Sequence, residues 1–373
     1  MKKTVLIIAG ETSGDIHAAN LVKHLKSTHP DLSFFGIGGK RMLEAGVDVV
    51  ERMEKLSIIG VSEVFAKLGH INRAYKKVLA RVKDSSPHLA ILVDYPGFNL
   101  TIAKRLKKTG LTVIYYITPQ IWAWGKSRAY SIKKYVDKAI VIFGFEEGLL
   151  RSYGIDATFV GHPILDAETQ KTAPTRESLG LDPDKLTIAL LPGSRESEVR
   201  NMLPVMLRTA SIVSVKKDTQ FILAKTSDID DKIYAGILAG SKLRIAGIKD
   251  NTYGTLALAD FTFTSSGTAT LECAIMERPM VIIYKTSFLT ALLFRLFAKT
   301  SFIGLVNIIA KREIAPEILQ YDATPGNLAR TILSIVSSKE KMEEQARALR
   351  EVKNTLGSPG ASQRAADIVK QFL

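Results

Sequence analysis

The residues best suited to chemistry lie in the segment Thr264-Ser-Ser-Gly-Thr-Ala-Thr-Leu-Glu272. Its pattern predicts the end of a strand, a glycine turn and a short helix, after which an Arg-Pro break leads into a second strand. Ser266, Gly267 and Thr268 then present hydroxyls and unpaired backbone N–H groups at a helix N-terminus, where a phosphate is favoured. Glu272 lies one turn further on the same face and can accept hydrogen bonds from two ribose hydroxyls. The segment predicts a nucleoside diphosphate site.

A second turn of this kind follows the apolar run Thr187–Leu191. It carries Pro-Gly, then Ser194 and Arg195, and an arginine beside a glycine turn can bind a diphosphate with two parallel hydrogen bonds. Glu196 and Glu198 are expected to be solvated first-turn acids that favour the helix dipole. Further along, the amides of Asn307 and Gln320 can also reach a ligand, although the pattern alone does not select them.

An aspartate ends the strand predicted over 89–93, in the segment Asp94-Tyr-Pro-Gly-Phe-Asn99. Ligands of open α/β sheets bind at the carboxyl ends of strands, and an aspartate there can take a proton from a substrate hydroxyl. Asn99 either orients a ligand or caps the following helix. The alternative is an Asx turn with Asn99 at the helix N-cap and no ligand.

The first predicted strand leads into Gly10-Glu-Thr-Ser-Gly-Asp15, which has the position of a dinucleotide loop without the G-x-G-x-x-G spacing. Gly36–Gly39 does not supply that spacing either, so an NAD site is disfavoured. Two readings stay open: a ligand loop in which Glu11 and Ser13 act, or a turn with Ser13 as N-cap and Asp15 in the first turn. His162 likewise either touches a ligand or is structural, at the predicted crossing between domains.

Metal and hydrolase chemistry lack their sequence signatures. The six histidines are scattered, and no D-x-D or G-x-S-x-G motif is present. We therefore expect no metal and no cofactor, with Arg195 and the Gly267 turn neutralising a leaving diphosphate.

Strands and helices must alternate to position these turns, and the apolar runs do so twice. A chain of 373 residues predicts two domains, here two doubly wound Rossmann-like α/β domains facing across a cleft, with a hinge around 165–185. The helices over 339–353 and 362–373 are expected to pack back on the first domain. The predicted strands are 4–9, 34–37, 89–93, 112–117, 139–142, 157–160, 187–191, 220–224, 243–245, 261–264 and 280–283.

Charge and hydrophobicity bound the partners. The net charge of +14 suits an anionic partner without identifying it, and no nucleic-acid-binding motif is present. Basic stretches over 64–83 and 101–138 follow an apolar stripe that fits either a membrane interface or a core. The single Cys273 fits a reducing cytoplasm, and no apolar run is long enough to span a bilayer. The residues of the stripe are Ile58, Val61, Val64, Phe65 and Leu68.

Taken together, these motifs resemble lipid-A-disaccharide synthases over residues 1 to about 320. Within the motifs, Tyr95 and Gly97 differ from the commoner residues, and Val306 replaces a proline. The segments that carry the resemblance are Ala9–Asp15, Asp94–Asn99, Pro119–Trp124, Gly161–His162, Leu190–Arg195 and Ser266–Cys273.

The resemblance implies a GT-B fold and a peripheral protein on the cytoplasmic face of the inner membrane. Residues 1–165 would form the acceptor- and membrane-facing domain, residues 166–344 would bind the UDP-sugar, and helices from about 345 to 373 would return to the first domain. The implied substrates are UDP-2,3-diacylglucosamine and 2,3-diacylglucosamine 1-phosphate (lipid X), which give a β-1,6-linked disaccharide and UDP.

Residue roles follow from the matched motifs. Asp94 is the implied general base, and Glu11 is placed with it as catalytic. On the UDP side the resemblance places Arg195, Glu272 and Asn307. The residues predicted near the acceptor are Ser13, Asn99 and His162.

Two other functions remain open from the sequence. One is another GT-B enzyme that uses UDP-N-acetylglucosamine, either a 2-epimerase or a different glycosyltransferase. The other is a non-catalytic lipid- or nucleotide-binding protein. The sequence does not determine the oligomeric state, and a dimer is one of the states it allows.

Overall fold

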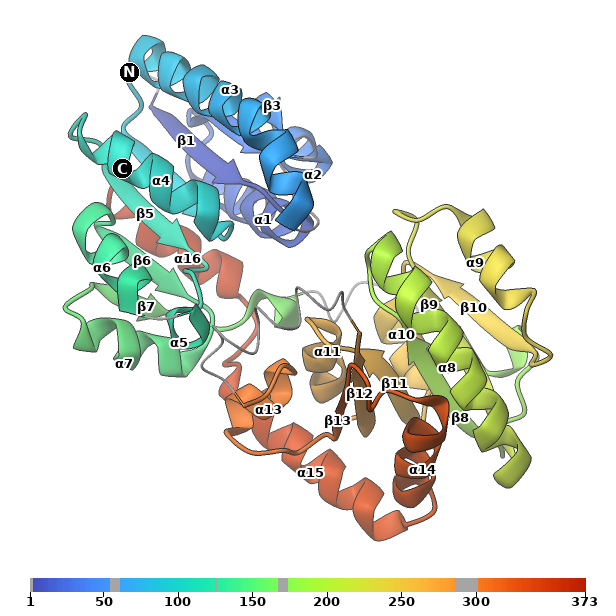
Figure 1. Cartoon of the computed structure of the whole chain (residues 1–373). Coiled ribbons are helices and arrows are strands. Elements are labelled where there is room, and N and C mark those ends of the chain that lie inside the picture. Colours follow the sequence, from blue (N-terminus) through green and yellow to red (C-terminus); the bar gives the residue numbers. More distant parts are fainter. Residues whose placement is uncertain (1–2, 54–60, 125, 167–173, 286–300) are drawn as a thin grey trace. The chain divides into compact units, whose positions relative to one another are not determined.

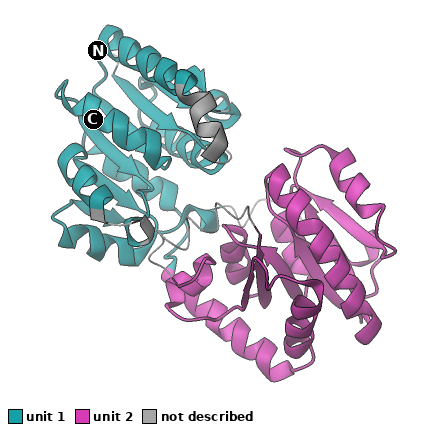
Figure 2. Cartoon of the chain, viewed as in Figure 1, with its two compact units in different colours: residues 1–166, 297–299, 356–373 teal, residues 167–296, 300–355 magenta. Residues whose placement is uncertain are grey.

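The computed structural model describes residues 3–53, 61–124, 126–166, 174–285 and 301–373, with the backbone alone for 61–68, 123, 124 and 126. The chain divides into two compact units (Figure 2). Unit 1 contains Met1–Asp166 and Leu356–Leu373, and unit 2 contains nearly all of the chain between them. Each unit is built around its own parallel sheet, as the alternation of apolar runs predicts.

Unit 1 has a seven-stranded parallel sheet in the order β3-β2-β1-β4-β5-β6-β7 (Figure 1). Its strands are β1 (Thr4–Ala9), β2 (Ser33–Gly38), β3 (Val47–Arg52), β4 (Leu89–Val93), β5 (Thr112–Tyr116), β6 (Lys138–Val141) and β7 (Ala157–Phe159). Its helices are α1 (Thr12–Thr28), α2 (Lys40–Glu44), α3 (Val61–Ser85), α4 (Pro96–Lys107), α5 (Ile121–Trp124), α6 (Lys126–Tyr135), α7 (Gly144–Ser152), the 3-10 turn η2 (Pro163–Asp166) and α16 (Ala361–Lys370).

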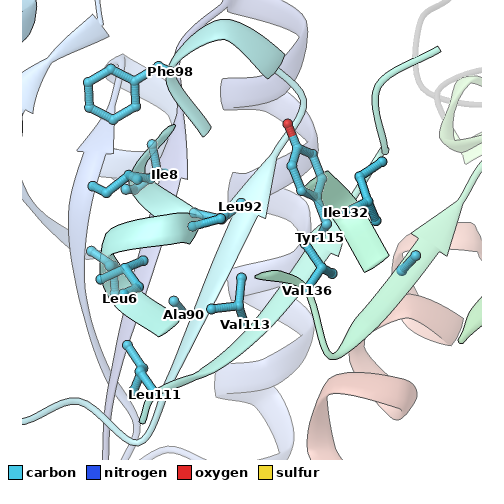
Figure 3. Close-up of a cluster of buried hydrophobic side chains, with 14 of the residues drawn as sticks. Leu6, Ile8, Ala90, Leu92, Phe98, Leu111, Val113, Tyr115, Ile132 and Val136 are labelled. Carbon is cyan, nitrogen blue, oxygen red and sulfur yellow. The ribbon is translucent and has the colours of Figure 1, made fainter. Parts of the chain in front are cut away.

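The core of unit 1 forms because alternate strand residues point to opposite faces of the sheet. On one face, strand residues such as Leu6, Leu92 and Tyr115 meet apolar residues of α3, α4 and α6 (Figure 3). Helices α1 and α16 pack against each other, and α1 also contacts β1 and β4.

Unit 2 repeats the plan with six parallel strands in the order β10-β9-β8-β11-β12-β13. The strands are β8 (Leu186–Leu191), β9 (Thr219–Lys225), β10 (Ile245–Lys249), β11 (Phe261–Ser265), β12 (Met280–Tyr284) and β13 (Glu317–Leu319). The helices are η3 (Glu177–Leu179), α8 (Glu196–Lys216), α9 (Asp231–Leu238), α10 (Thr252–Leu258), α11 (Ala269–Ile275), α13 (Leu305–Ala310), α14 (Pro325–Val336) and α15 (Lys339–Thr355).

The return to unit 1 occurs later than predicted. Helix α15 packs on α11, α13 and α14 of unit 2 and buries Ala348, Leu349 and Val352. The boundary therefore lies at 355/356 rather than near 345, and α16 alone of these two helices packs on unit 1. There the Asp166 carboxylate accepts hydrogen bonds from the backbone N–H groups of Gly360, Ala361 and Ser362 at the start of α16. The two segments of unit 1 that adjoin unit 2 in the sequence are thus hydrogen-bonded to each other, through Asp166 and the start of α16.

In each sheet the strand order reverses direction at one point, and parallel α/β sheets bind ligands outside the carboxyl ends of strands at that point. In unit 1 it lies between β1 and β4, and in unit 2 between β8 and β11. These strands end at Ala9, Val93, Leu191 and Ser265, so the turns singled out from the sequence follow the four expected strands.

Candidate functional site

The carboxyl edge of the unit 1 sheet brings together the turns that follow β1 and β4. A Cβ atom on Gly10 would lie 2.1 Å from the Tyr95 ring, so only glycine lets these turns approach so closely. The carboxylates of Glu11 and Asp94 are near enough for the charge of one to raise the pKa of the other. The two predicted catalytic acids therefore lie together.

Asp94 is held by its main chain. The residue has a left-handed backbone with φ of 47°, and Tyr95 follows with φ of 49°. The Asp94 carbonyl oxygen accepts hydrogen bonds from Asn99 Nδ2 at 2.7 Å and from the Tyr115 hydroxyl at 2.7 Å. These bonds hold a backbone conformation that aspartate adopts rarely.

Asn99 is not the helix cap that one of its two predicted alternatives required. Helix α4 starts at Pro96 with Tyr95 at the N-cap, so Asn99 lies inside the helix and is not its cap. Its side chain is fully buried and also donates to the Val93 carbonyl at 3.2 Å. Asn99 thus braces the Asp94 turn from behind.

The Asp94 carboxyl group has the character of a base. Burial raises its pKa to about 6, and the Glu11 charge adds to the rise. A general base works best when its pKa lies near the working pH. Ionised at neutral pH and more basic than an ordinary aspartate, Asp94 can accept a proton from a bound hydroxyl.

The first turn of α1 differs from the Ser13 prediction. The helix begins at Thr12 with Glu11 in the N-cap position, and Ser13 is an exposed residue within it. Asp15 is buried, and its carboxylate accepts hydrogen bonds from the N–H groups of Gly39, Arg41 and Met42. Asp15 therefore fixes α2, a tertiary contact that a first-turn acid does not reveal in the sequence.

His162 makes packing and hydrogen-bond contacts within unit 1. It is 5% exposed, its Nδ1 accepts a hydrogen bond from the Ile164 N–H, and its ring lies 5.1 Å from that of Phe143. Burial lowers the pKa of the imidazole to about 3. Its backbone N–H donates to the Leu356 carbonyl at the second unit boundary, which agrees with the structural alternative.

One buried acid at this edge was not singled out by sequence reasoning. Glu146 follows β6, is 4% exposed and accepts a hydrogen bond of 3.0 Å from the Trp122 indole N–H. Burial raises its pKa to about 7, with a contribution from the Asp94 charge. Its sequence signal was weak, because a glutamate in the first turn of a helix is usually solvated.

At the carboxyl edge of the unit 2 sheet, Ser194 and Arg195 lead from β8 into α8. Both side chains are exposed, and their backbone N–H groups donate to Glu198 Oε2 at 3.1 and 3.2 Å. The Arg195 guanidinium lies 3.7 Å from Glu198 Oε1. Glu198 is therefore no mere solvated acid, because it shapes the turn that presents Arg195.

The neighbouring turn after β11 contains the predicted phosphate residues. Gly267 has φ of 149°, which favours glycine, and Thr268 is exposed before α11. The Ser266 hydroxyl donates to the Ile303 carbonyl at 2.9 Å, so it holds the turn in place. Burial raises the pKa of Glu272 to about 7.

The Asn307 amide was predicted to reach a ligand, but its side chain lies in the interior of unit 2. It is fully buried, and its Nδ2 donates to the Ala315 carbonyl and to Glu317 Oε1. Its Oδ1 accepts from the N–H groups of Ile314 and Ala315, so every side-chain bonding position is used within unit 2.

The carboxylate of Glu317 links this amide to the phosphate turn. It also accepts from the N–H groups of Ile303 and Gly304, beside the carbonyl that Ser266 contacts. Gln320 lies just after β13 with φ of 49°, and its N–H donates to the Tyr284 carbonyl at the neighbouring strand end. Gln320 therefore lies at the carboxyl end of an edge strand of the unit 2 sheet.

Four of the five residues of the predicted apolar stripe belong to α3. Ile58 lies outside the described residues, and Val61, Val64, Phe65 and Leu68 belong to α3 at positions whose side chains are not described. Within the described ranges, no helix has the length and apolar character needed to span a bilayer. The same ranges contain no group of three or more His, Cys, Asp or Glu side chains placed to hold a metal ion.

Solved structures share this architecture. UDP-GlcNAc 2-epimerase from Neisseria meningitidis, bound to UDP-GlcNAc, gives a TM-score of 0.67 at 11% identity and covers 99% of this chain and 100% of its own. The calicheamicin glycosyltransferase CalG4 gives 0.63 at 13% identity, covering 100% and 98%. At these identities the likeness concerns the fold alone, and it agrees with the predicted GT-B fold of two parallel-sheet α/β domains.

Sequence relatives are more specific. A family model described as lipid-A-disaccharide synthetase matches residues 5–372. The lipid-A-disaccharide synthase of Syntrophus aciditrophicus is 42% identical over 377 residues, covering 98% of this chain and 96% of the relative. That of Geobacter sulfurreducens is 39% identical over 372 residues, covering 99% and 97%. The chain therefore belongs to the lipid-A-disaccharide synthase family, which makes it a glycosyltransferase of lipid A biosynthesis.

Proposed function

We propose that this enzyme transfers 2,3-diacylglucosamine from its UDP derivative to the 6-hydroxyl of 2,3-diacylglucosamine 1-phosphate (lipid X), with inversion and without a metal. The observation that carries the proposal is Asp94, a carboxylate of raised pKa at the switch point of the unit 1 sheet. It takes the proton of the acceptor hydroxyl as that oxygen bonds to the anomeric carbon. The bond from that carbon to the diphosphate breaks, and UDP leaves.

The UDP end of the donor is assigned to the strand ends of unit 2. There the Arg195 guanidinium and the N–H groups around Gly267 supply the positive charge that a leaving diphosphate needs. Ser194, Ser266, Thr268 and Gln320 line the same strand ends. Glu272 accepts hydrogen bonds from the ribose, and Asn307 acts through Glu317 on the Ser266 turn.

Both proposed substrates carry acyl chains, so we place the enzyme as a peripheral protein on the cytoplasmic face of the inner membrane. Exposed basic residues of α3 and α4 support an anionic surface as partner, among them Arg73, Lys76, Lys104 and Arg105. Nucleic acid is not proposed as a partner.

The test is mass spectrometry of the products that purified protein forms from UDP-2,3-diacylglucosamine and lipid X. We expect the disaccharide 1-phosphate and UDP in equal amounts. Unacylated UDP-N-acetylglucosamine in a parallel reaction separates this activity from that of a 2-epimerase, which would convert it without an acceptor. Binding of both lipids without UDP release would leave a non-catalytic protein.

Asp94→Asn should reduce turnover by about 10²–10⁴, because a positioned base contributes that much. The wild-type rate should also fall as pH is lowered through about 6, where Asp94 becomes protonated. Circular dichroism establishes that the variant is folded. A folded Asp94→Asn enzyme with near-normal turnover would remove Asp94 from the role of base.

A further inference from the structure

The carboxyl ends of β4 and β5 carry unusual backbone. Besides Asp94 and Tyr95, Ile117 has a left-handed conformation with φ of 61°. A β-branched residue rarely adopts this conformation, and such strain persists where surrounding structure holds a functional segment. Here the Ile117 N–H donates to the Ile140 carbonyl, and the Asp94 N–H donates to the Tyr116 carbonyl. The chain leaving β5 is therefore directed along the edge that presents Asp94.

This directed segment leads to Trp122. Ile121 is 6% exposed and anchors the segment in the core, whereas Trp122 is partly exposed. The Trp122 ring meets that of Phe145 edge-on with centroids 5.8 Å apart. Phe145 in turn stacks on the buried Phe143. Trp122 is thus the partly exposed end of a packed aromatic group.

Glu146 fixes the orientation of the indole. A carboxyl group that is 4% exposed costs free energy to bury, and this one accepts a hydrogen bond from the Trp122 N–H at 3.0 Å. Because the indole N–H is bonded to Glu146 and the ring also packs on Phe145, the exposed part of the ring is what remains for contact. The segment that carries Trp122 follows β5, which pairs with β4 up to Val93 and Tyr116, so it leaves the same edge of the sheet as the proposed base Asp94.

We propose that Trp122 is a specificity-determining residue for the acceptor, with its ring as the platform for the apolar face of the acceptor sugar and Glu146 as its positioning residue. The inference rests on the proposed function. A pyranose has a C–H face that packs on an aromatic ring and a hydroxyl rim that requires polar partners. Trp122 supplies the aromatic ring for the C–H face, and the carboxylates of Glu11 and Asp94 supply polar partners for the hydroxyl rim.

The experiment measures KM for lipid X and for UDP-2,3-diacylglucosamine separately. We expect Trp122→Leu to raise KM for lipid X about five- to tenfold, as loss of an aromatic contact would, with KM for the donor unchanged. Trp122→Phe keeps a ring and should stay within about twofold. Tyr130→Leu, which removes a 64% exposed aromatic ring from α6, is the matched control and should change neither KM.

The positioning role predicts a rescue. Glu146→Gln keeps a carbonyl acceptor for the indole N–H and should preserve KM for lipid X, whereas Glu146→Leu should raise it as Trp122→Leu does. A purely structural Glu146 would alter both KM values together.

Two further results decide the remaining cases. If Trp122→Leu does not fold, lipid X should still change Trp122 fluorescence in Trp124→Phe protein, and an unchanged signal would overturn the proposal. If the wild-type enzyme forms disaccharide but Trp122→Leu leaves KM for lipid X unaltered, the role of Trp122 as acceptor platform is refuted and the proposed function stands. A wild-type enzyme that forms no disaccharide refutes the proposed function.

Discussion

At the scale of single residues, two carboxyl groups of the candidate site share one property, a pKa that burial raises. Asp94 directly follows a strand of unit 1, Glu272 lies in the first turn of the helix that follows a strand of unit 2, and burial raises the pKa of each. The raised pKa keeps the carboxylate a strong hydrogen-bond acceptor, but the charged form is less stable than in water. A ligand hydroxyl that donates to it restores part of the lost solvation.

For Glu272 this predicts pH-dependent donor binding. Ribose hydroxyls favour the ionised carboxylate, so affinity should be complete above the pKa and decline as pH falls through about 7. A group of this pKa is about tenfold less ionised at pH 6 than at pH 8, and the dissociation constant of UDP-2,3-diacylglucosamine should rise by about that factor. Titration calorimetry of the wild type measures the change.

Glu272→Gln supplies the control for that titration. It should bind the donor with the same affinity at both pH values, since the amide does not titrate. If the variant retains the full pH dependence, another group is responsible.

The sequence predicted the location of residues that come soon after an apolar run. Asp94, Arg195 and Glu272 follow apolar runs, so a parallel sheet must bring them to a carboxyl edge. Hydrogen bonds to residues distant in the sequence could not be predicted. From the sequence alone, Glu146 has the pattern of a solvated helix residue and Asn307 that of an amide available to a ligand.

At the scale of elements, most strands were predicted because buried parallel strands are continuous apolar runs. β1 and β4 were predicted with their observed bounds. β3 and β13 were missed, and the strand predicted at 243–245 was misplaced, since it shares only Ile245 with β10 (Ile245–Lys249). All three lie at sheet edges, and β3 carries the polar residues Asp48, Glu51 and Arg52. An edge strand needs less apolar surface, and its sequence signal weakens accordingly.

A chain of hydrogen bonds joins elements of unit 2 to the phosphate turn. It runs from the Asn307 amide on α13 to Glu317 on β13, then to the backbone at Ile303 and Gly304, whose neighbouring carbonyl accepts from Ser266. The turn is positioned by contacts that come from residues far along the chain.

Asn307→Ala should therefore act through stability. It leaves the N–H groups of Ile314 and Ala315 buried without their acceptor, which should cost about 2–4 kcal/mol in urea unfolding. Asn327→Ala removes exposed amide hydrogen bonds and should cost less than about 1 kcal/mol. Unchanged stability together with a raised KM for the UDP-sugar would instead place Asn307 in contact with ligand.

At the scale of the whole molecule, a set of exposed cations lies on one side of unit 1. Helices α3, α4 and α6 cover the same face of its sheet, so their outer surfaces lie on one side. Two of their exposed cations form ion pairs, Lys77 with Glu51 and Arg81 with Asp48. The other exposed cations on these helices or at their ends are Arg73, Lys76, Lys83, Lys104, Arg105, Lys108, Lys133 and Lys134. Such a surface favours anionic headgroups, and each cation near a bilayer contributes about 1 kcal/mol.

The apolar stripe that begins α3 is expected to add the hydrophobic part of membrane binding. Replacing Val61, Val64 and Leu68 together with Ser should release the enzyme from vesicles containing anionic lipid, because apolar contact with the interface is lost while the cations remain. Co-sedimentation measures the bound fraction, and thermal unfolding tests the fold. Val215→Ser, which alters an 87% exposed valine on α8, should leave binding unchanged. A triple variant that unfolds would instead show that these three side chains belong to the core of unit 1, and the cations alone would then have to account for attachment.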